Sequence, residues 1–174
     1  MKNLVFAFAL LCSTSLVAQF SFNENGTGIQ SSNSIASGDY SISLGVQTEA
    51  IGDIATAMGA ITTASGTNST AMGYDTNASA DYSTTMGYQT EASGNVSTAM
   101  GGYTTAQDYG TTAIGLFNKT KETPNPDIFS YQNTAFVIGN GVSDNRSNAF
   151  EVLFDGTTTI AGNVTAPAFI GDGS

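Results

Sequence analysis

The side chains of this sequence that could perform acid–base chemistry are its carboxylates. The chain contains no His, and its one cysteine, Cys12, lies within the first 18 residues. Because His-based catalytic triads and the usual Cys/His zinc sites need these residues, neither can be built from the rest of the chain. Two carboxylates at a suitable separation could still hydrolyse a glycosidic bond. The acidic residues of the central region are Asp39, Glu49, Asp53, Asp75, Asp81, Glu91 and Asp108.

Most of these carboxylates stand beside predicted turns, a position typical of solvated charges that keep a protein soluble. We therefore predict no enzymatic activity, and we expect no catalytic residue, cofactor or metal site. The chain has 14 acidic and 4 basic residues and a net charge of −10. Because nucleic acids and anionic membrane surfaces attract Lys and Arg, this balance disfavours both as partners.

Three tyrosines could contribute to binding through the contact surface of their rings. Tyr74, Tyr88 and Tyr103 each follow a regularly spaced glycine by one or two residues, at a point where neighbouring residues vary along the chain. Tyrosine offers a large contact area at a low cost in conformational entropy. These rings are therefore a candidate ligand-contact strip, and packing between neighbouring chains is the alternative.

The elements that must position these side chains follow an internal repeat of 14 residues. One column of the repeat is glycine: Gly45, Gly59, Gly73, Gly87, Gly101 and Gly115. Another is alanine: Ala36, Ala50, Ala64, Ala78, Ala92 and Ala106. A large apolar residue always precedes the glycine: Leu44, Met58, Met72, Met86, Met100 and Ile114. Because these columns share one period without insertion, residues 38–121 are predicted to form six copies of one structural unit.

Each unit shows the alternation of a β-strand. Thr70 and Met72 are predicted to point to one side, and Ser69 and Ala71 to the other. A short second strand follows before the next glycine corner, so the fold class is all-β, a parallel β-roll with coils about 4.8 Å apart. The ladder from Leu44 to Ile114 then forms either the core or a contact with another roll. We favour the contact within an oligomer, because one coil is too narrow to enclose much apolar volume.

The units resemble the head repeats of the trimeric autotransporter adhesins, the YadA-like family. The likeness is carried by Ser69–Gly73 and Ser97–Gly101, with Ala78 and Ala92 at the later alanine position, and it spans about residues 34–117. The resemblance implies a left-handed parallel β-roll, three chains side by side, and adhesion to host or matrix surfaces. The partners it implies are two further copies of the chain and a host or matrix protein or a glycan.

The flanks of the repeat have other compositions. Residues 1–18 carry Lys2, a short apolar run and a small-residue exit at Ala18, which predicts a signal peptide and an exported protein. Residues 19–37 are expected to cap one end of the roll. Residues 122–174 are expected to form a β-rich cap or extension, with Asp155-Gly156 as a hairpin turn. No heptad stalk is apparent, and we expect no transmembrane anchor in this chain.

The function expected from the sequence is a secreted or surface-exposed structural and adhesive protein, the head segment of a trimeric adhesin or fibre. An ice- or glycan-binding β-solenoid is the alternative, because threonine also recurs in two columns. One runs from Thr56 to Thr112 and the other from Thr48 to Thr104. A hydrolase would require a defined pocket with paired carboxylates.

Overall fold

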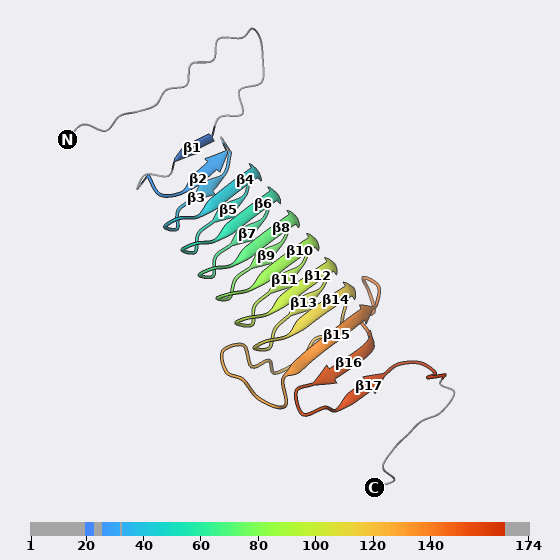
Figure 1. The fold of residues 1–174 in the computed structure, drawn as a ribbon. Helices are drawn as coiled ribbons and strands as arrows, with labels where there is room; N and C mark the ends of the chain where they lie inside the picture. The colour runs from blue at the N-terminus through green and yellow to red at the C-terminus, as the bar shows by residue number, and fades with distance from the viewer. Residues whose placement is uncertain (1–19, 23–25, 32, 166–174) are drawn as a thin grey trace, which may run out of the picture.

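The computed structural model describes residues 20–22, 26–31 and 33–165, and the regular elements of these residues are all strands (Figure 1). The strands are arranged as a slender stack of coils with a small antiparallel extension at the carboxyl end. This confirms the predicted all-β class. The expected signal peptide, residues 1–18, lies outside the described residues.

Each 14-residue unit contributes one long and one short strand. The long strands are β4 (Ile42–Val46), β6 (Thr56–Ala60), β8 (Thr70–Tyr74), β10 (Thr84–Tyr88), β12 (Thr98–Gly102) and β14 (Thr112–Leu116). The short strands are β3 (Ile35–Ala36), β5 (Glu49–Ala50), β7 (Thr63–Ala64), β9 (Asn77–Ala78), β11 (Glu91–Ala92) and β13 (Thr105–Ala106). The two kinds of strand form two separate sheets, in which neighbouring coils pair in parallel.

The register of both sheets equals the sequence period. Met72 lies between Met58 and Met86 in the long sheet, and Ala78 lies between Ala64 and Ala92 in the short sheet. Identical positions of the repeat therefore stack directly on one another. The predicted parallel β-solenoid of about six 14-residue turns is confirmed.

The glycine column is required by the close approach of successive coils. Gly73 has a φ of 128°, a conformation that side-chain-bearing residues rarely adopt. A Cβ atom placed on Gly73 would lie 2.0 Å from the carbonyl oxygen of Gly87 in the next coil. Both the backbone conformation and the lack of space therefore select glycine at this corner.

The interior of the solenoid contains small side chains. The buried apolar residues of the described chain are eleven alanines and Val137. Ser69 and Ala71 are fully buried, whereas Thr70 and Met72 on the same strand point outward. The predicted alternation is therefore confirmed, with serine and alanine on the inside.

The Leu/Met/Ile ladder lies outside the coil, so of the two alternatives left open for it, a core column of the single chain does not hold, and the favoured contact with another chain stays a prediction. Met58 and Met86 are 38% and 41% exposed, and the other four members are partly exposed. The physical reason is the small distance between the two walls of the coil. Ser43 and Thr48 lie in opposite parts of one coil, and their hydroxyl oxygens are 2.8 Å apart. Side chains as large as methionine have no room in such an interior.

Additional strands continue the long sheet at both ends. β1 (Phe20–Phe22) pairs antiparallel with β2 (Ile29–Ser31), which pairs in parallel with β4. At the other end β15 (Thr134–Asn140) pairs in parallel with β14, and here the register changes, because Gly115 lies beside Gly139. The loop between β14 and β15 accounts for this longer interval.

β16 (Asn148–Leu153) and β17 (Thr158–Ile160) complete the sheet as an antiparallel meander. The hairpin predicted at Asp155-Gly156 is confirmed by the pairing of these two strands. Among the described residues, the short sheet has no further strand beyond β13 at this end, and a side chain takes the place of one. The Asn118 side-chain amide accepts a hydrogen bond from the Thr105 backbone N–H and donates one to its carbonyl oxygen, as a further strand would.

Candidate functional site

The outward side of the six long strands of the repeat is a continuous surface without charge. We call it the long-sheet face, and it consists of three columns of residues. They are Ile42, Thr56, Thr70, Thr84, Thr98 and Thr112; Leu44, Met58, Met72, Met86, Met100 and Ile114; and Val46, Ala60, Tyr74, Tyr88, Gly102 and Leu116. None of these positions carries a formal charge, although the chain as a whole has a net charge of −10.

The acidic residues of the repeat lie on other surfaces of the solenoid. Glu91 is exposed on the short sheet, Asp75 is exposed at the corner after β8, and Asp53 is exposed in a turn before β6. The long-sheet face is apolar along its middle column, and a contiguous exposed apolar surface of this kind usually marks a site of protein contact.

The three tyrosines of the candidate strip are in ring contact with one another. Tyr74 and Tyr88 are stacked with centroids 5.3 Å apart, and Tyr103 meets Tyr88 edge to face at 5.2 Å. The contact continues to Phe117, whose ring is stacked on Tyr103 at 4.2 Å. Phe117 was not predicted to belong to the strip, although it follows the same glycine column as Tyr103. We call these four rings the tyrosine strip.

Tyr103 does not stand in the same column as the other two tyrosines. Gly102 is the residue in register with Tyr88, and Tyr103 reaches the strip from the following position. The pKa of Tyr88 is raised above its ordinary value, mainly by a side-chain hydrogen bond with Tyr103. Each ring of the two stacked pairs has one face covered by its partner. This leaves less ring surface for the face-to-face stacking that aromatic side chains offer to ligands.

A second row of exposed apolar residues runs along the opposite edge of the long-sheet face. Tyr40, Ile54, Tyr82 and Val96 are 69%, 55%, 60% and 48% exposed. Each stands two residues before a long strand, so the row lies at the beginning of the strands, whereas the tyrosine strip lies at their ends. We call it the second corner strip. The row was not predicted from the sequence, although Tyr40 and Ile54, and again Tyr82 and Val96, stand 14 residues apart; Asn68 interrupts it between Ile54 and Tyr82.

The two threonine columns lie on different sides of the wall of the solenoid. The column from Thr56 to Thr112 belongs to the long-sheet face and is partly exposed. The column of Thr48, Thr62, Thr76, Thr90 and Thr104 is buried inside the coil. The second column therefore cannot form part of a solvent-facing threonine surface.

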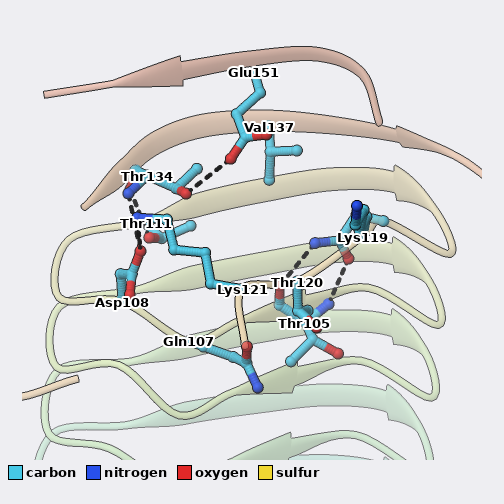
Figure 2. Close-up of a pocket in the computed structure, with 11 residues that line it drawn as sticks. Thr105, Gln107, Asp108, Thr111, Lys119, Thr120, Lys121, Thr134, Val137 and Glu151 are labelled. Atoms are coloured by element: carbon cyan, nitrogen blue, oxygen red, sulfur yellow. Dashed lines mark hydrogen bonds and ion pairs between the residues drawn. The ribbon is translucent and has the colours of Figure 1, made fainter. Parts of the chain in front are cut away.

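A small cavity lined by carboxylates lies where the loop after β14 crosses the end of the repeat. Figure 2 shows the side chains around this cavity, among them Asp108, Lys121 and Glu151. The cavity has a volume of about 20 Å³, which is room for one water molecule. It therefore contains two carboxylates but has no space for a substrate.

Asp108 is the buried member of this cluster. Its carboxylate lies 2.8 Å from the Lys121 ammonium and accepts hydrogen bonds from the backbone amides of Asn125 and Thr134. Burial acts to raise the pKa of Asp108, but these hydrogen bonds and the Lys121 charge outweigh it and hold the pKa below its usual value. The expectation of a solvated surface charge is wrong for Asp108, because its partner comes from a loop outside the periodic region.

The described residues contain no group of three or more Asp, Glu, His or Cys side chains placed to hold a metal ion. Within the same part of the chain, no helix has the length and apolar character needed to cross a membrane.

Comparison with known families gives one result that agrees with this geometry. The model of the YadA head domain repeat (2 copies) matches four stretches of the chain, residues 36–62, 64–90, 78–103 and 92–118. Apart from Thr63 of β7, these stretches cover the long and short strands of the solenoid from β4 to β14. A search of curated proteins found no match.

Proposed function

Because the repeats between residues 36 and 118 belong to the YadA head repeat family, we propose that this chain forms the head of a homotrimeric surface adhesin. The family and the β-solenoid fold are adhesive and structural in character rather than enzymatic. We propose that three copies place their long-sheet faces around a common axis, and that the assembled head attaches the cell to a host or matrix protein or to a glycan.

The observation that carries the proposal is the combination of an apolar, uncharged outer face with an interior of small side chains. A core of alanine and serine removes little apolar surface from water, so one solenoid gains little stability from its own interior. Met58 and Met86 remain 38% and 41% exposed in the single chain. Burial of this ladder between three chains would add the large apolar side chains that the interior lacks.

Export to the cell surface forms part of the same proposal. The signal peptide expected at residues 1–18 and the surface-associated character of the family support it. The mature chain would then contain no cysteine, so its stability in an oxidising environment would depend on packing and assembly rather than on disulfides.

Attachment can be tested with the purified full chain fused to a trimeric coiled coil and coupled to beads. We expect the beads to be retained on at least one of three surfaces, which are immobilised matrix proteins, glycan arrays and cultured host cells. The control is the coiled coil alone. Retention equal to that control on all three surfaces would contradict an adhesive function.

An ice-binding solenoid is less well supported. A flat ice-binding face needs threonine side chains side by side at the surface, and the column from Thr48 to Thr104 is buried. We expect no thermal hysteresis from the purified chain. Measured hysteresis would favour this alternative over adhesion.

A further inference from the structure

We infer that the tyrosine strip of one chain packs against the second corner strip of its neighbour in the trimer, so that each chain-to-chain seam is made of two different corners. This inference rests on the proposed trimer. It assigns the tyrosines to a contact between chains instead of a contact with a ligand.

The positions of the two strips favour this pairing. The second corner strip lies where the long strands begin and the tyrosine strip lies where they end, on opposite edges of one face. In a cyclic trimer every contact is heterologous, so a surface of one chain meets a different surface of the next. If three long-sheet faces surround one axis, the beginning edge of one chain meets the ending edge of its neighbour.

The backbone conformation of the second corner strip also favours a contact there. Tyr40, Ile54, Tyr82 and Val96 have φ values of 58°, 59°, 58° and 61°. β-branched residues are rare in this left-handed region, whereas asparagine adopts it readily. Asn68 occupies the equivalent position with a φ of 57°. The local backbone therefore does not favour Ile54 or Val96, and a contact made by their side chains explains them better.

The carboxylates beside this strip are held by hydrogen bonds to the preceding coil. Asp53 and Asp81 directly precede Ile54 and Tyr82 in the sequence. The Asp53 carboxylate accepts a hydrogen bond from the Asp39 backbone N–H at 3.0 Å, and the Asp81 carboxylate accepts one from Thr67 at 2.8 Å. These bonds hold both carboxylates along the stack of coils, so the apolar side chains form the part of the corner that a neighbour would meet.

The tyrosine strip suits such a neighbour better than it suits a sugar. Tyr74 and Tyr88 cover one face of each other, as do Tyr103 and Phe117. Tyr74 and Tyr88 are nevertheless 44% and 45% exposed. Rows of partly exposed rings match a second row of apolar side chains in the same coils, and the second corner strip supplies such a row, interrupted only at Asn68.

Disulfide cross-linking between the two corners tests the inference. In a Cys12→Ser background of the full chain, we would introduce Tyr82→Cys and Gln89→Cys, which flank β10 at the same level of the solenoid. The two positions are separated by roughly 20 Å along an extended strand, far beyond the roughly 7 Å Cα separation that a disulfide tolerates. A bond between them can therefore form only between chains, and three such bonds close a ring.

We expect a covalent trimer as the main species on a non-reducing gel after mild oxidation. The matched control is Glu49→Cys with Gln89→Cys, because Glu49 lies on the short sheet three coils away and should give no covalent trimer. The single variants Tyr82→Cys and Gln89→Cys should also give none.

Sedimentation of the reduced double variant separates the two possible failures. A trimer in solution that yields no covalent trimer overturns the paired corners and leaves the proposed trimer intact. A monomer that also yields no covalent trimer contradicts the proposed trimer and this inference together.

Discussion

The guanidinium carbon of Arg146 lies 5.8 Å from the centre of the Phe117 ring, at the end of the tyrosine strip. The same side chain donates hydrogen bonds from Nη1 to the carbonyl oxygens of Tyr103 at 2.9 Å and Asn118 at 3.2 Å. Arg146 belongs to the loop between β15 and β16, whereas its partners belong to the last coils of the repeat. The contact therefore fastens the C-terminal strands to the solenoid.

Replacement of this arginine should loosen the C-terminal strands. We expect Arg146→Ala to cost about 1–2 kcal/mol, because it removes two hydrogen bonds from a charged donor at a partly exposed site. Hydrogen exchange in β15 and β16 should accelerate, while exchange in β6 and β8 should not change. Lys119→Ala is the control, since it also removes one positive charge from an exposed side chain nearby. If hydrogen exchange in β15 and β16 were equally fast in the two variants, the Arg146 contacts would not be what holds these strands in place.

Two neighbouring residues of β8 distinguish the inside of the solenoid from its outside. Ala71 is fully buried, so Ala71→Asp would enclose an unpaired carboxylate and should unfold the chain. Met72 points outward, so Met72→Asp should leave the β-sheet circular dichroism of the chain in place but abolish the trimer. In the assembly the defect would occur three times at one level, without a basic residue nearby.

Glu91, which is exposed on the short sheet, provides the control for both charge variants. Glu91→Ala changes a carboxylate away from the long-sheet face and should alter neither fold nor assembly. Sedimentation and circular dichroism at one protein concentration are sufficient for the comparison. If Met72→Asp remains trimeric, the long-sheet face is not the interface.

The glycine column should tolerate no side chain. Gly73→Ala would combine a φ of 128° with a Cβ atom 2.0 Å from the Gly87 carbonyl oxygen, so successive coils would have to move apart. We expect a loss of more than about 3 kcal/mol, consistent with backbone strain of 1–3 kcal/mol plus the steric clash. Gly162→Ala, at a position with no neighbour within 4 Å, should leave the melting temperature unchanged. Similar melting temperatures for the two variants would mean that the coils are less closely stacked.

The ion pair of Asp108 and Lys121 should make stability depend on pH. The pKa of Asp108 is lower in the folded chain than the value of about 4 expected when unfolded. Its contribution to the free energy of unfolding is therefore present above about pH 4 and is lost as the pH falls through the folded-state pKa. Asp108→Asn should cost about 3 kcal/mol at pH 7, near the lower end for a buried pair because Lys121 is partly exposed.

Urea denaturation at several pH values measures this effect. The difference in the free energy of unfolding between parent and Asp108→Asn should shrink as the pH is lowered below 4. Asp144→Asn, which changes an exposed carboxylate, should differ little from the parent throughout. A constant difference for Asp108→Asn across the whole range would exclude titration of this carboxylate as the cause.

The period of the fold could be predicted from the sequence because each coil repeats the same backbone constraints. The glycine corners, the two strands per unit and the parallel register all follow from residues that recur every 14 positions. Sequence alternation also separated Ala71 from Met72. The alternation could not show which of these two residues lies inside the coil, because that depends on the distance between the two walls of the coil.

The contacts that could not be predicted from the sequence arise where the chain departs from its 14-residue period. Asp108 occupies the position of Gly94 in the repeat, and its partner Lys121 comes from the loop before β15. The path of that loop depends on tertiary contacts such as the hydrogen bond from Asn125, which no local pattern specifies. Arg146 likewise reaches Tyr103 from a distant part of the chain.

Sedimentation equilibrium of the full chain tests the central claim most directly. The uncharged long-sheet face predicts a single species with three times the mass of one chain, which persists in high salt because its contacts are apolar. The chain fused to a trimeric coiled coil supplies the reference for a tethered trimer. A clean monomer over the whole concentration range, with the Met ladder still exposed to solvent, would contradict the account.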